Sequence, residues 1–391
     1  MRRIIFFSVI VLQMVTIHAG EFTKWGNDKG VDIFFDYTAE VMSNVSGGER
    51  TGTGYNGLSS FGLDADLGEA FGWEGIILRL SGMDLHGSGI SSRVGDMMGV
   101  SDIEGYGSIR LYESWLEKKF DTPALSLRAG MLLADEEFTI LDTAGAFLNA
   151  TFGWPEFISM NTVNTGPAFY IPALGGRLMW HPSETFYLQF GVFDGDTFDS
   201  PDGDDSVNRH GLHWGMGNGQ GTMFMGEMGY HWNNEGDESL PGVFKLGIWH
   251  HSGSFDDFSG GSAHDGTQGF YASLEQMVYR EYGEQGLAWF SRTGFAPENR
   301  SEVEQSFQIG VSYIGLLPGR DIDSFALGLS KASISRDLPG RTSETVVEAA
   351  YEYIFSDDFI IQPSVQWVKD PGAIGELEDA LVFGLRVNLS F

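Results

Sequence analysis

The chain has 391 residues, no cysteine and a formal net charge of −31 at pH 7. Such an acidic chain is unsuited to nucleic acid, which requires a basic surface. The absence of cysteine excludes disulfides, thiolate metal sites and cysteine nucleophiles. Aromatic residues make up 14% and hydrophobic residues 42% of the sequence, so the chain does not have the composition of a disordered protein.

The N-terminal segment, residues 1–19, has the pattern of a secretory signal peptide. Arg2 and Arg3 form a basic start, residues 4–12 are a short apolar run, and Ala19 suits a cleavage site. A buried N-terminal strand is the alternative interpretation. Beyond this segment no apolar run approaches the roughly eighteen residues of a membrane helix, so a mature chain that enters a membrane must do so with strands.

Apolar and polar residues alternate with a period of two along the chain, most clearly in residues 380–391. Leu381 and Phe383 fall on one face of this segment, and Gly384 and Arg386 fall on the other, as in a β-strand. The alternation recurs at 185–193, 306–313, 324–330, 347–353 and 361–367. A soluble β-sandwich strand also alternates, but the final segment has the length of a tilted membrane-spanning strand. With no visible domain boundary, residues 20–391 are predicted to form one all-β, antiparallel transmembrane β-barrel.

One long segment, residues 134–158, interrupts the alternation with mixed apolar and polar residues and Pro155. Long loops in barrels are usually functional. If this loop folds back into the lumen, its apolar side chains are covered and the pore is narrowed. An external loop with a short helix is the alternative.

Three classes of function remain for this chain: a pore, a membrane-embedded enzyme and a secreted binding protein. The sequence contains no G-x-S-x-G or H-E-x-x-H motif. His250 and His251 are adjacent and would face opposite sides of a strand, which does not favour a shared metal. The acidic stretch 194–206 lacks the ordered spacing of a calcium loop, which favours a solvated loop. We therefore expect no enzyme activity, no cofactor and no metal site.

Several of the scarce basic residues fall on the polar face of predicted strands. Arg79 lies between Leu78 and Leu80, and Arg128 and Arg177 also alternate with apolar neighbours. An arginine on the lipid face would cost about 2–4 kcal/mol at the membrane midplane. These arginines are therefore predicted to face the lumen.

Carboxylates and a tryptophan share a face in the predicted strand 110–120, and a turn near residues 121–123 would bring its Glu117 beside Arg128. The resulting candidate channel constriction consists of Arg79, Glu113, Trp115, Glu117, Arg128 and Arg177. Charged hydrogen-bonding groups beside an aromatic ring suit a sugar. The alternative is that the ion pair of Glu117 and Arg128 only braces neighbouring strands.

At these residues the chain resembles the carbohydrate-selective porin family, the OprB-type porins. Matching stretches include RLYESWLEKKF (110–120), SLRAGMLLADEEF (126–138), LNATFGWPEFISMN (148–161), GPAFYIPALGGRL (166–178) and ALVFGLRVNLSF (380–391). The FGWP stretch and the W-L-E strand carry the most weight, and matches span nearly the whole mature chain.

The resemblance implies a barrel of about sixteen strands, with lumen-folded loops, in the outer membrane of a Gram-negative bacterium. Small sugars such as glucose, and ions, would pass through it. Its other partners would be outer-membrane lipid, the barrel-assembly machinery through the C-terminal Phe391, and further copies in a homotrimer. The acidic loops keep a general or cation-preferring porin as an alternative. An embedded hydrolase or a secreted carbohydrate-binding protein represents the other classes.

Overall fold

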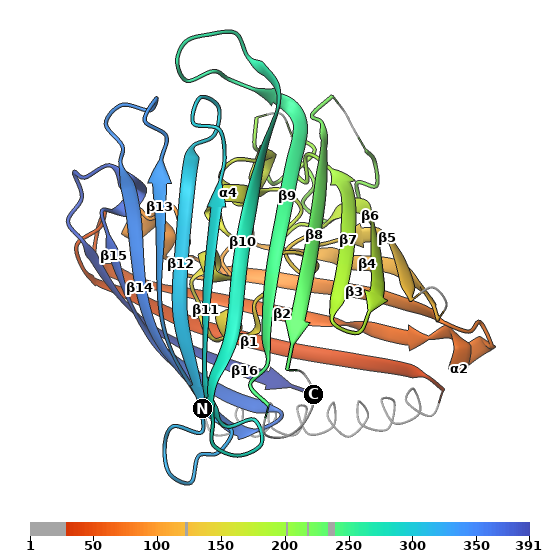
Figure 1. The fold of residues 1–391 in the computed structure, drawn as a ribbon. Coiled ribbons are helices and arrows are strands. Elements are labelled where there is room, and N and C mark those ends of the chain that lie inside the picture. Colours follow the sequence, from red (N-terminus) through yellow and green to blue (C-terminus); the bar gives the residue numbers. More distant parts are fainter. Residues whose placement is uncertain (1–28, 122–123, 201, 217–218, 234–238) are drawn as a thin grey trace, which may run out of the picture.

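The computed structural model describes residues 29–391 except 122–123, 201, 217–218 and 234–238, so the expected signal peptide lies outside the described residues. Sixteen antiparallel strands close into a single barrel, in which the first strand pairs with both the second and the last (Figure 1). This confirms the predicted fold class. Within the described part of the chain, no helix is long and apolar enough to cross a membrane.

The strands follow chain order around the barrel, and each pairs with its neighbours in sequence. Their bounds are β1 (Val31–Ser46), β2 (Gly52–Asp66), β3 (Ile76–Gly87), β4 (Ser108–Phe120), β5 (Leu125–Leu132), β6 (Ala173–Ser183), β7 (Phe186–Asp194), β8 (Thr222–Trp232), β9 (Gly242–Phe255), β10 (His264–Arg280), β11 (Gly286–Phe295), β12 (Val303–Ile314), β13 (Ser324–Ile334), β14 (Ser343–Ser356), β15 (Phe359–Lys369) and β16 (Ala380–Ser390). Each alternating segment named above coincides with one of these strands.

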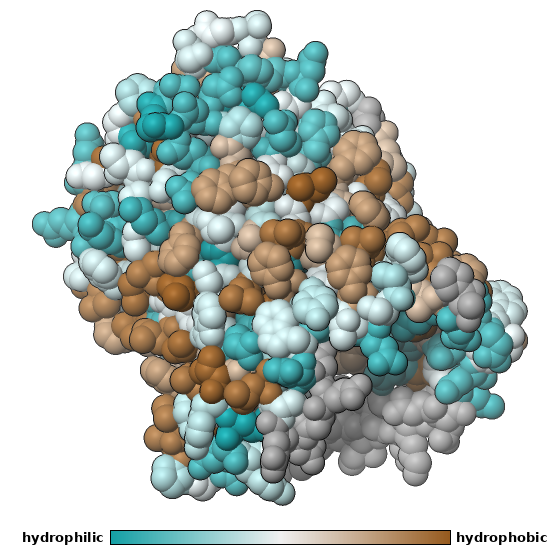
Figure 2. All heavy atoms as spheres, in the orientation of Figure 1, coloured by the Kyte–Doolittle hydropathy of each residue, from teal (hydrophilic) through white to brown (hydrophobic). Residues whose placement is uncertain are grey.

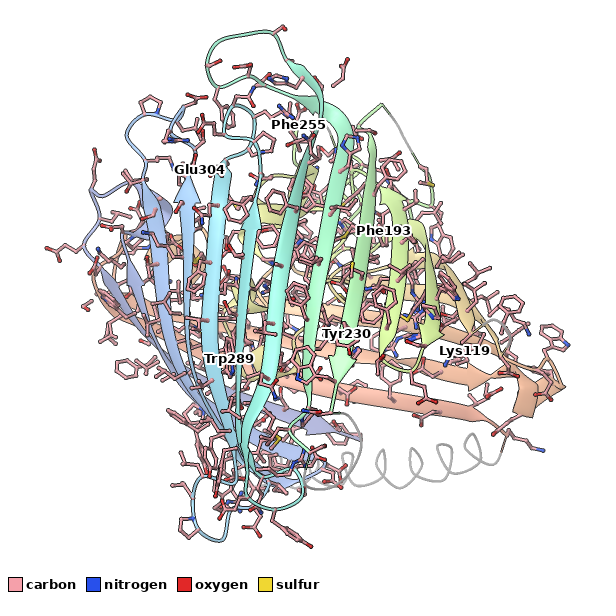
Figure 3. The ribbon with its side chains drawn as sticks, viewed as in Figure 1. Lys119, Phe193, Tyr230, Phe255, Trp289 and Glu304 are labelled. Atoms are coloured by element: carbon pink, nitrogen blue, oxygen red, sulfur yellow. The ribbon has the colours of Figure 1, made fainter. Side chains whose placement is uncertain are left out.

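Outward side chains of the strands are mostly apolar and form a belt around the barrel. Figure 2 shows a band of hydrophobic residues across one face, with hydrophilic residues above it. Tyr230 of β8 and Trp289 of β11 lie toward the strand ends that carry the short connections (Figure 3). Aromatic residues at this level are typical of a barrel at the membrane–water interface.

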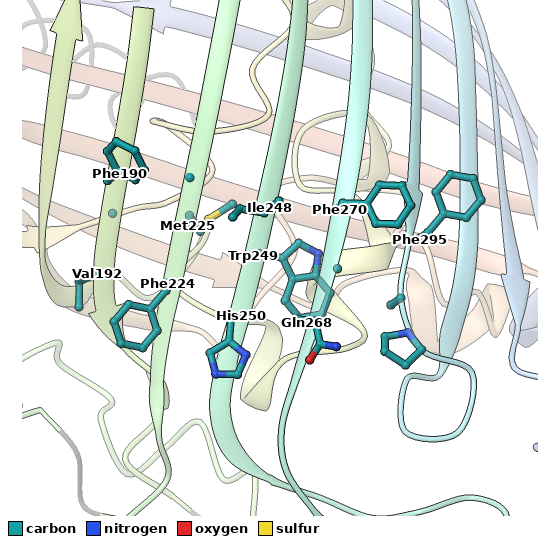
Figure 4. Close-up of a pocket in the computed structure, with 15 residues that line it drawn as sticks. Phe190, Val192, Phe224, Met225, Ile248, Trp249, His250, Gln268, Phe270 and Phe295 are labelled. Carbon is teal, nitrogen blue, oxygen red and sulfur yellow. The ribbon is translucent and has the colours of Figure 1, made fainter.

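A hollow of about 780 Å³ lies on the outer face of the barrel, over β7 to β11 (Figure 4). Phe190, Phe224, Ile248 and Phe270 line it, and all four are exposed. Because these side chains point away from the lumen, the hollow belongs to the apolar belt and not to the channel.

The connection between β5 and β6, residues 133–172, folds into the barrel. Arg292 on β11 donates hydrogen bonds to the carbonyl oxygens of Thr139 at 2.8 Å and Phe152 at 2.7 Å. The connection contains η1 (Asp142–Ala146), η2 (Ala150–Phe152), α4 (Glu156–Ser159) and η3 (Val163–Thr165). Since it reaches the wall opposite its own strands, the prediction that the 134–158 loop enters the lumen is confirmed.

Two glycines on the opposite wall let the aromatic side chains of this connection approach the backbone. A Cβ atom at Gly294 would lie 2.3 Å from the ring of Phe157, and one at Gly328 would lie 2.7 Å from the ring of Phe147. Any larger residue at either position would force the loop away from the wall.

A second connection, residues 88–107 with α3 (Ser91–Val94), also packs inside the barrel. Glu344 on β14 accepts hydrogen bonds from the backbone N–H groups of Met97 at 2.9 Å and Met98 at 3.0 Å. The short helix α2 (Leu67–Phe71) lies at the other end of the barrel, between β2 and β3. Between these two inward connections and the strands β1 to β4 a cavity remains.

Candidate channel lining

The strand register places the predicted arginines and carboxylates on one wall. Glu117 of β4 is directly opposite Arg128 of β5, and Arg128 is directly opposite Arg177 of β6. Because residues directly opposite each other on neighbouring strands face the same side of a sheet, and both arginines contact Glu137 of the inward connection, all three point into the barrel. The predicted neighbourhood of Glu117 and Arg128 is confirmed.

These three residues form a closed ion-pair network with Glu137, and we call Glu117, Arg128, Glu137 and Arg177 the arginine–glutamate cluster. Arg128 contacts Glu117 at 2.9 Å and Glu137 at 2.5 Å. Arg177 contacts Glu117 at 3.2 Å and Glu137 at 2.8 Å. Each guanidinium therefore binds both carboxylates, and the two charges of each sign balance.

We call the inward connection between β5 and β6, residues 133–172, the lumen loop. Glu137 belongs to this loop, while the other three members of the cluster are on the barrel wall, so Glu137 connects the loop to the wall. Its side chain is only 6% exposed, compared with 19% for Arg128. Its backbone oxygen accepts a further hydrogen bond from Gln189 on β7 at 2.7 Å. The loop is thus attached to the wall by buried, charge-assisted hydrogen bonds, which are stronger than neutral ones.

Trp115 joins the arginine–glutamate cluster to the remaining predicted residues. The guanidinium of Arg128 lies 3.8 Å from the centroid of the Trp115 ring, within the range of a cation–π contact. The indole N–H of Trp115 donates to Glu113 at 2.8 Å. Through Glu113, which also contacts Arg79, the six predicted residues form one connected set. Arg128 covers one face of the Trp115 ring, and Trp115 is only 7% exposed, so the ring does not offer its face to a solute.

Arg79 occupies the other end of this set. It contacts Asp64 on β2 at 3.0 Å and Glu113 on β4 at 2.6 Å. The contact with Glu113 is an ion pair in which the N–H does not point at the oxygen. Arg79 also lies over the ring of Phe34, 5.1 Å from its centroid, and it is more exposed than Arg128.

A cavity of about 810 Å³ lies between the wall of β1 to β4 and the two inward connections. Arg79 and Glu113 line it, together with Asp135 and Glu136 of the lumen loop. The other four predicted residues do not line this cavity: Trp115, Glu117, Arg128 and Arg177. The predicted set therefore divides into two residues on the cavity surface and four beside it.

Two carboxyl groups of the lumen loop are perturbed by their surroundings. Asp135 accepts a hydrogen bond from the backbone N–H of Phe169 at 3.0 Å, but burial and then the charge of Glu113 raise its pKa to about 6. The Glu136 side chain is exposed to the lumen, but protein atoms surround the position closely enough to weaken its hydration. This enclosure, followed by repulsion from Glu113 and Asp135, raises the pKa of Glu136 to about 8.

Sequence reasoning missed three functional side chains: Asp135, Glu136 and Glu137. They stand in the loop segment ADEEF (134–138), which begins two residues after the end of β5. The signal that could have found them is three consecutive carboxylates just after the strand that carries Arg128. Which of the three meets Arg128 depends on how the loop turns, and periodicity does not report that.

The other candidate sites considered from sequence do not assemble. Among the described residues, no group of three or more His, Asp or Glu side chains is arranged to hold a metal ion. His250 is outward while His251 is buried, with a ring nitrogen 2.7 Å from the carbonyl oxygen of Gly195. In the acidic stretch 194–206, Asp196 accepts hydrogen bonds from backbone N–H groups within its own loop, as in turns.

A closed barrel with an apolar outer belt, a polar lumen and inward loops defines a channel of the outer-membrane porin class. Residues 50–391 match the family described as carbohydrate-selective porin, OprB family, and the chain belongs to that family. It is accordingly an outer-membrane protein of Gram-negative bacteria.

Two relatives match over nearly their whole length. Porin B of Pseudomonas aeruginosa is 23% identical over 420 residues, covering 93% of this chain and 88% of the relative. The putative porin QuiX of Acinetobacter baylyi is 23% identical over 411 residues, covering 91% of this chain and 89% of the relative.

Solved structures show the same fold. OprB of Pseudomonas putida at high pH aligns with a TM-score of 0.82 at 22% identity, covering 95% of this chain and 97% of that chain. The low-pH structure of the same protein aligns with a TM-score of 0.62 at 18% identity, covering 95% of this chain and 96% of that chain.

Proposed function

We propose that this porin passes small carbohydrates by passive diffusion, and that the cavity beside β1 to β4 is the narrow part of their path. The observation that carries the proposal is the cavity itself, whose wall combines a guanidinium, carboxylates and aromatic rings. Arg79 supplies donors and the partly exposed carboxylate of Asp36 supplies acceptors for sugar hydroxyls, and Phe34 supplies an apolar surface for a sugar ring. Each contact must be weak, because a solute has to leave the channel as well as enter it.

The four residues beside the cavity have a different role in this proposal. Trp115, Glu117, Arg128 and Arg177 support the constriction, because together with Glu137 they hold the lumen loop against the wall. Arg79 touches the solute, and Glu113, which is only 3% exposed, holds Arg79 in place.

A planar-bilayer experiment separates these roles. Sugar added to the bath should block part of the ion current through the wild-type channel. Arg79→Ala should weaken this block several-fold, and Arg79→Lys, which keeps the charge, should retain part of it. Arg128→Ala should leave the block close to that of the wild type and lower the melting temperature. Equal loss of sugar block in the two alanine variants, with unchanged melting temperatures, would contradict this division.

Catalysis is not part of the proposed function. No nucleophile–base motif is present in the sequence, and the family is one of channels. An embedded hydrolase would instead cleave an ester, peptide or glycoside, and one point substitution would abolish the cleavage. A secreted binding protein would bind a sugar without forming a conducting channel.

The remaining partners are also proposals. We propose that Phe391 serves the barrel-assembly machinery: its N–H donates to the carbonyl oxygen of Phe35 at 3.0 Å, and the residue remains 47% exposed at the barrel end. Outer-membrane lipid would cover the apolar belt.

For a homotrimer we propose the outer face of β1 to β3 as the contact. There Tyr37 and Tyr55 share a 2.6 Å hydrogen bond, and His86 lies 3.2 Å from Asp84. Polar groups facing lipid are costly, so cover by another copy would be favourable. Chemical crosslinking in outer membranes tests the assembly.

A further inference from the structure

The lumen cavity carries a large excess of negative charge. Among the described residues that line it, nine are acidic and one, Arg79, is basic. Arg79 is already paired with both Asp64 and Glu113, so its charge is neutralised locally. The cavity therefore presents carboxylates that no basic residue on its own surface balances.

Arg386 and the two arginines of the arginine–glutamate cluster are paired with carboxylates as well. Arg386 contacts Glu40 at 2.6 Å and also contacts Asp102. The two arginines of the arginine–glutamate cluster are matched by its two glutamates. None of these guanidinium groups is free to offset the carboxylates of the cavity.

Three carboxylates of the cavity face it without a partner. Asp32, Asp36 and Glu136 form no hydrogen bond or ion pair with another side chain in the described part of the chain. Asp32 of β1 is directly opposite Asp64 of β2 in the sheet register. Like charges directly opposite each other are unfavourable in a sheet, and a cation between them relieves the repulsion.

From this charge distribution we infer that the channel prefers sugars with a protonated amine, that is, cationic amino sugars, over neutral sugars and most strongly over acidic sugars. The inference rests on the proposed sugar channel and names its favoured substrate class. The carboxylates bind the ammonium group, while Ser60 and the ring of Phe34, which also line the cavity, suit the hydroxyl groups and the sugar ring.

The pKa values of the lumen loop agree with this preference. Enclosure by protein and the neighbouring negative charges raise the pKa of both Asp135 and Glu136. A cationic solute lowers the free energy of their charged forms, so it binds as they ionise. A monovalent cation about 5 Å from one uncompensated carboxylate in water-like surroundings is enriched on the order of fourfold, and an anion is depleted by the same factor.

The first test uses the full-length protein in liposomes of neutral lipid at pH 7. Swelling rates are measured with glucosamine, glucose, N-acetylglucosamine and glucuronate. We expect glucosamine to enter several-fold faster than glucuronate. We also expect it to be faster than N-acetylglucosamine, which has the same ring without the charge. Failure of glucose to enter at all would refute the proposed sugar channel. Entry of glucose together with glucuronate as fast as glucosamine would overturn the inference alone.

The second test locates the preference. Asp36→Asn, which removes an unpartnered carboxylate of the cavity, should lower the ratio of glucosamine to glucose entry at pH 7 by about fourfold. The matched control is Asp357→Asn, in the exposed turn between β14 and β15, which should leave the ratio unchanged. An equal effect of both variants would overturn the assignment to the cavity. The reversal potential of the wild-type channel in a KCl gradient needs no variant: cation preference supports the inference, and anion preference overturns it.

Discussion

Removing the Glu137 carboxylate should release the lumen loop from the wall. Glu137 is the member of the arginine–glutamate cluster that belongs to the loop, and it accepts hydrogen bonds from Arg128 at 2.5 Å and Arg177 at 2.8 Å. In Glu137→Ala both guanidinium groups keep Glu117 as their one carboxylate partner among the described residues. One positive charge is then left without a partner in a largely buried place.

The size of the effect follows from burial. Removing one partner of a buried ion pair costs about 3–5 kcal/mol. Arg128 is 19% exposed, so water can replace part of the lost interaction, and the lower limit of about 3 kcal/mol is appropriate. Such a loss changes the equilibrium between attached and detached loop by about two orders of magnitude. Other anchors remain, including the hydrogen bonds from Arg292 to the loop, so the barrel should still assemble.

The assay combines single-channel recording with thermal unfolding in detergent. Glu137→Ala should show noisier open-channel current, a higher mean conductance and a lower melting temperature than the wild type. Glu137→Gln keeps one acceptor oxygen and should be intermediate. The control is Glu298→Ala, which removes the partner of Arg336 on the exposed surface, where an ion pair contributes at most about 1 kcal/mol. If Glu137→Ala matches this control in current noise and melting temperature, the loop is not held by the cluster.

Four further outcomes are expected. Arg128→Ala should make the channel more cation-selective, since it removes a positive charge near the lumen. The measurement is the reversal potential in a salt gradient, and an unchanged value would contradict a contribution of Arg128 to ion selectivity. Carboxyl groups are neutral below their pKa, so lowering the pH from about 9 to about 5 should protonate Glu136 and then Asp135. The ratio of cation to anion permeability should fall as these charges are lost. A ratio that rises on acidification would refute the role of these two carboxyl groups in cation preference. Deleting Phe391 should reduce the amount of heat-stable barrel in the outer membrane, and normal insertion of the deletion variant would refute the role of Phe391 in assembly. Intact-mass analysis should show a mature chain that starts near Gly20, and an uncleaved chain would refute the signal peptide.

Local sequence pattern determined the barrel and the side of the wall that each residue faces. Period-two alternation decides these features because neighbouring residues of a strand must point to opposite sides, and the lipid and the lumen have opposite polarity. The positions of Arg79 and Arg386 on the lumen side follow from this rule alone. A short turn after β4 likewise makes β4 and β5 partners, and this placed Glu117 beside Arg128.

The tertiary structure decided which lumen-facing residues line the open cavity. Arg79 and Arg128 look alike in the sequence, since each alternates with apolar residues. They differ in the structure because Glu137, from a loop without periodicity, pairs with Arg128 and not with Arg79. The path of that loop depends on contacts with distant strands, such as those of Arg292, which no local pattern encodes. Sequence alone could therefore identify the charged wall, while the closed barrel and its inward loops determined which part of it borders the open cavity.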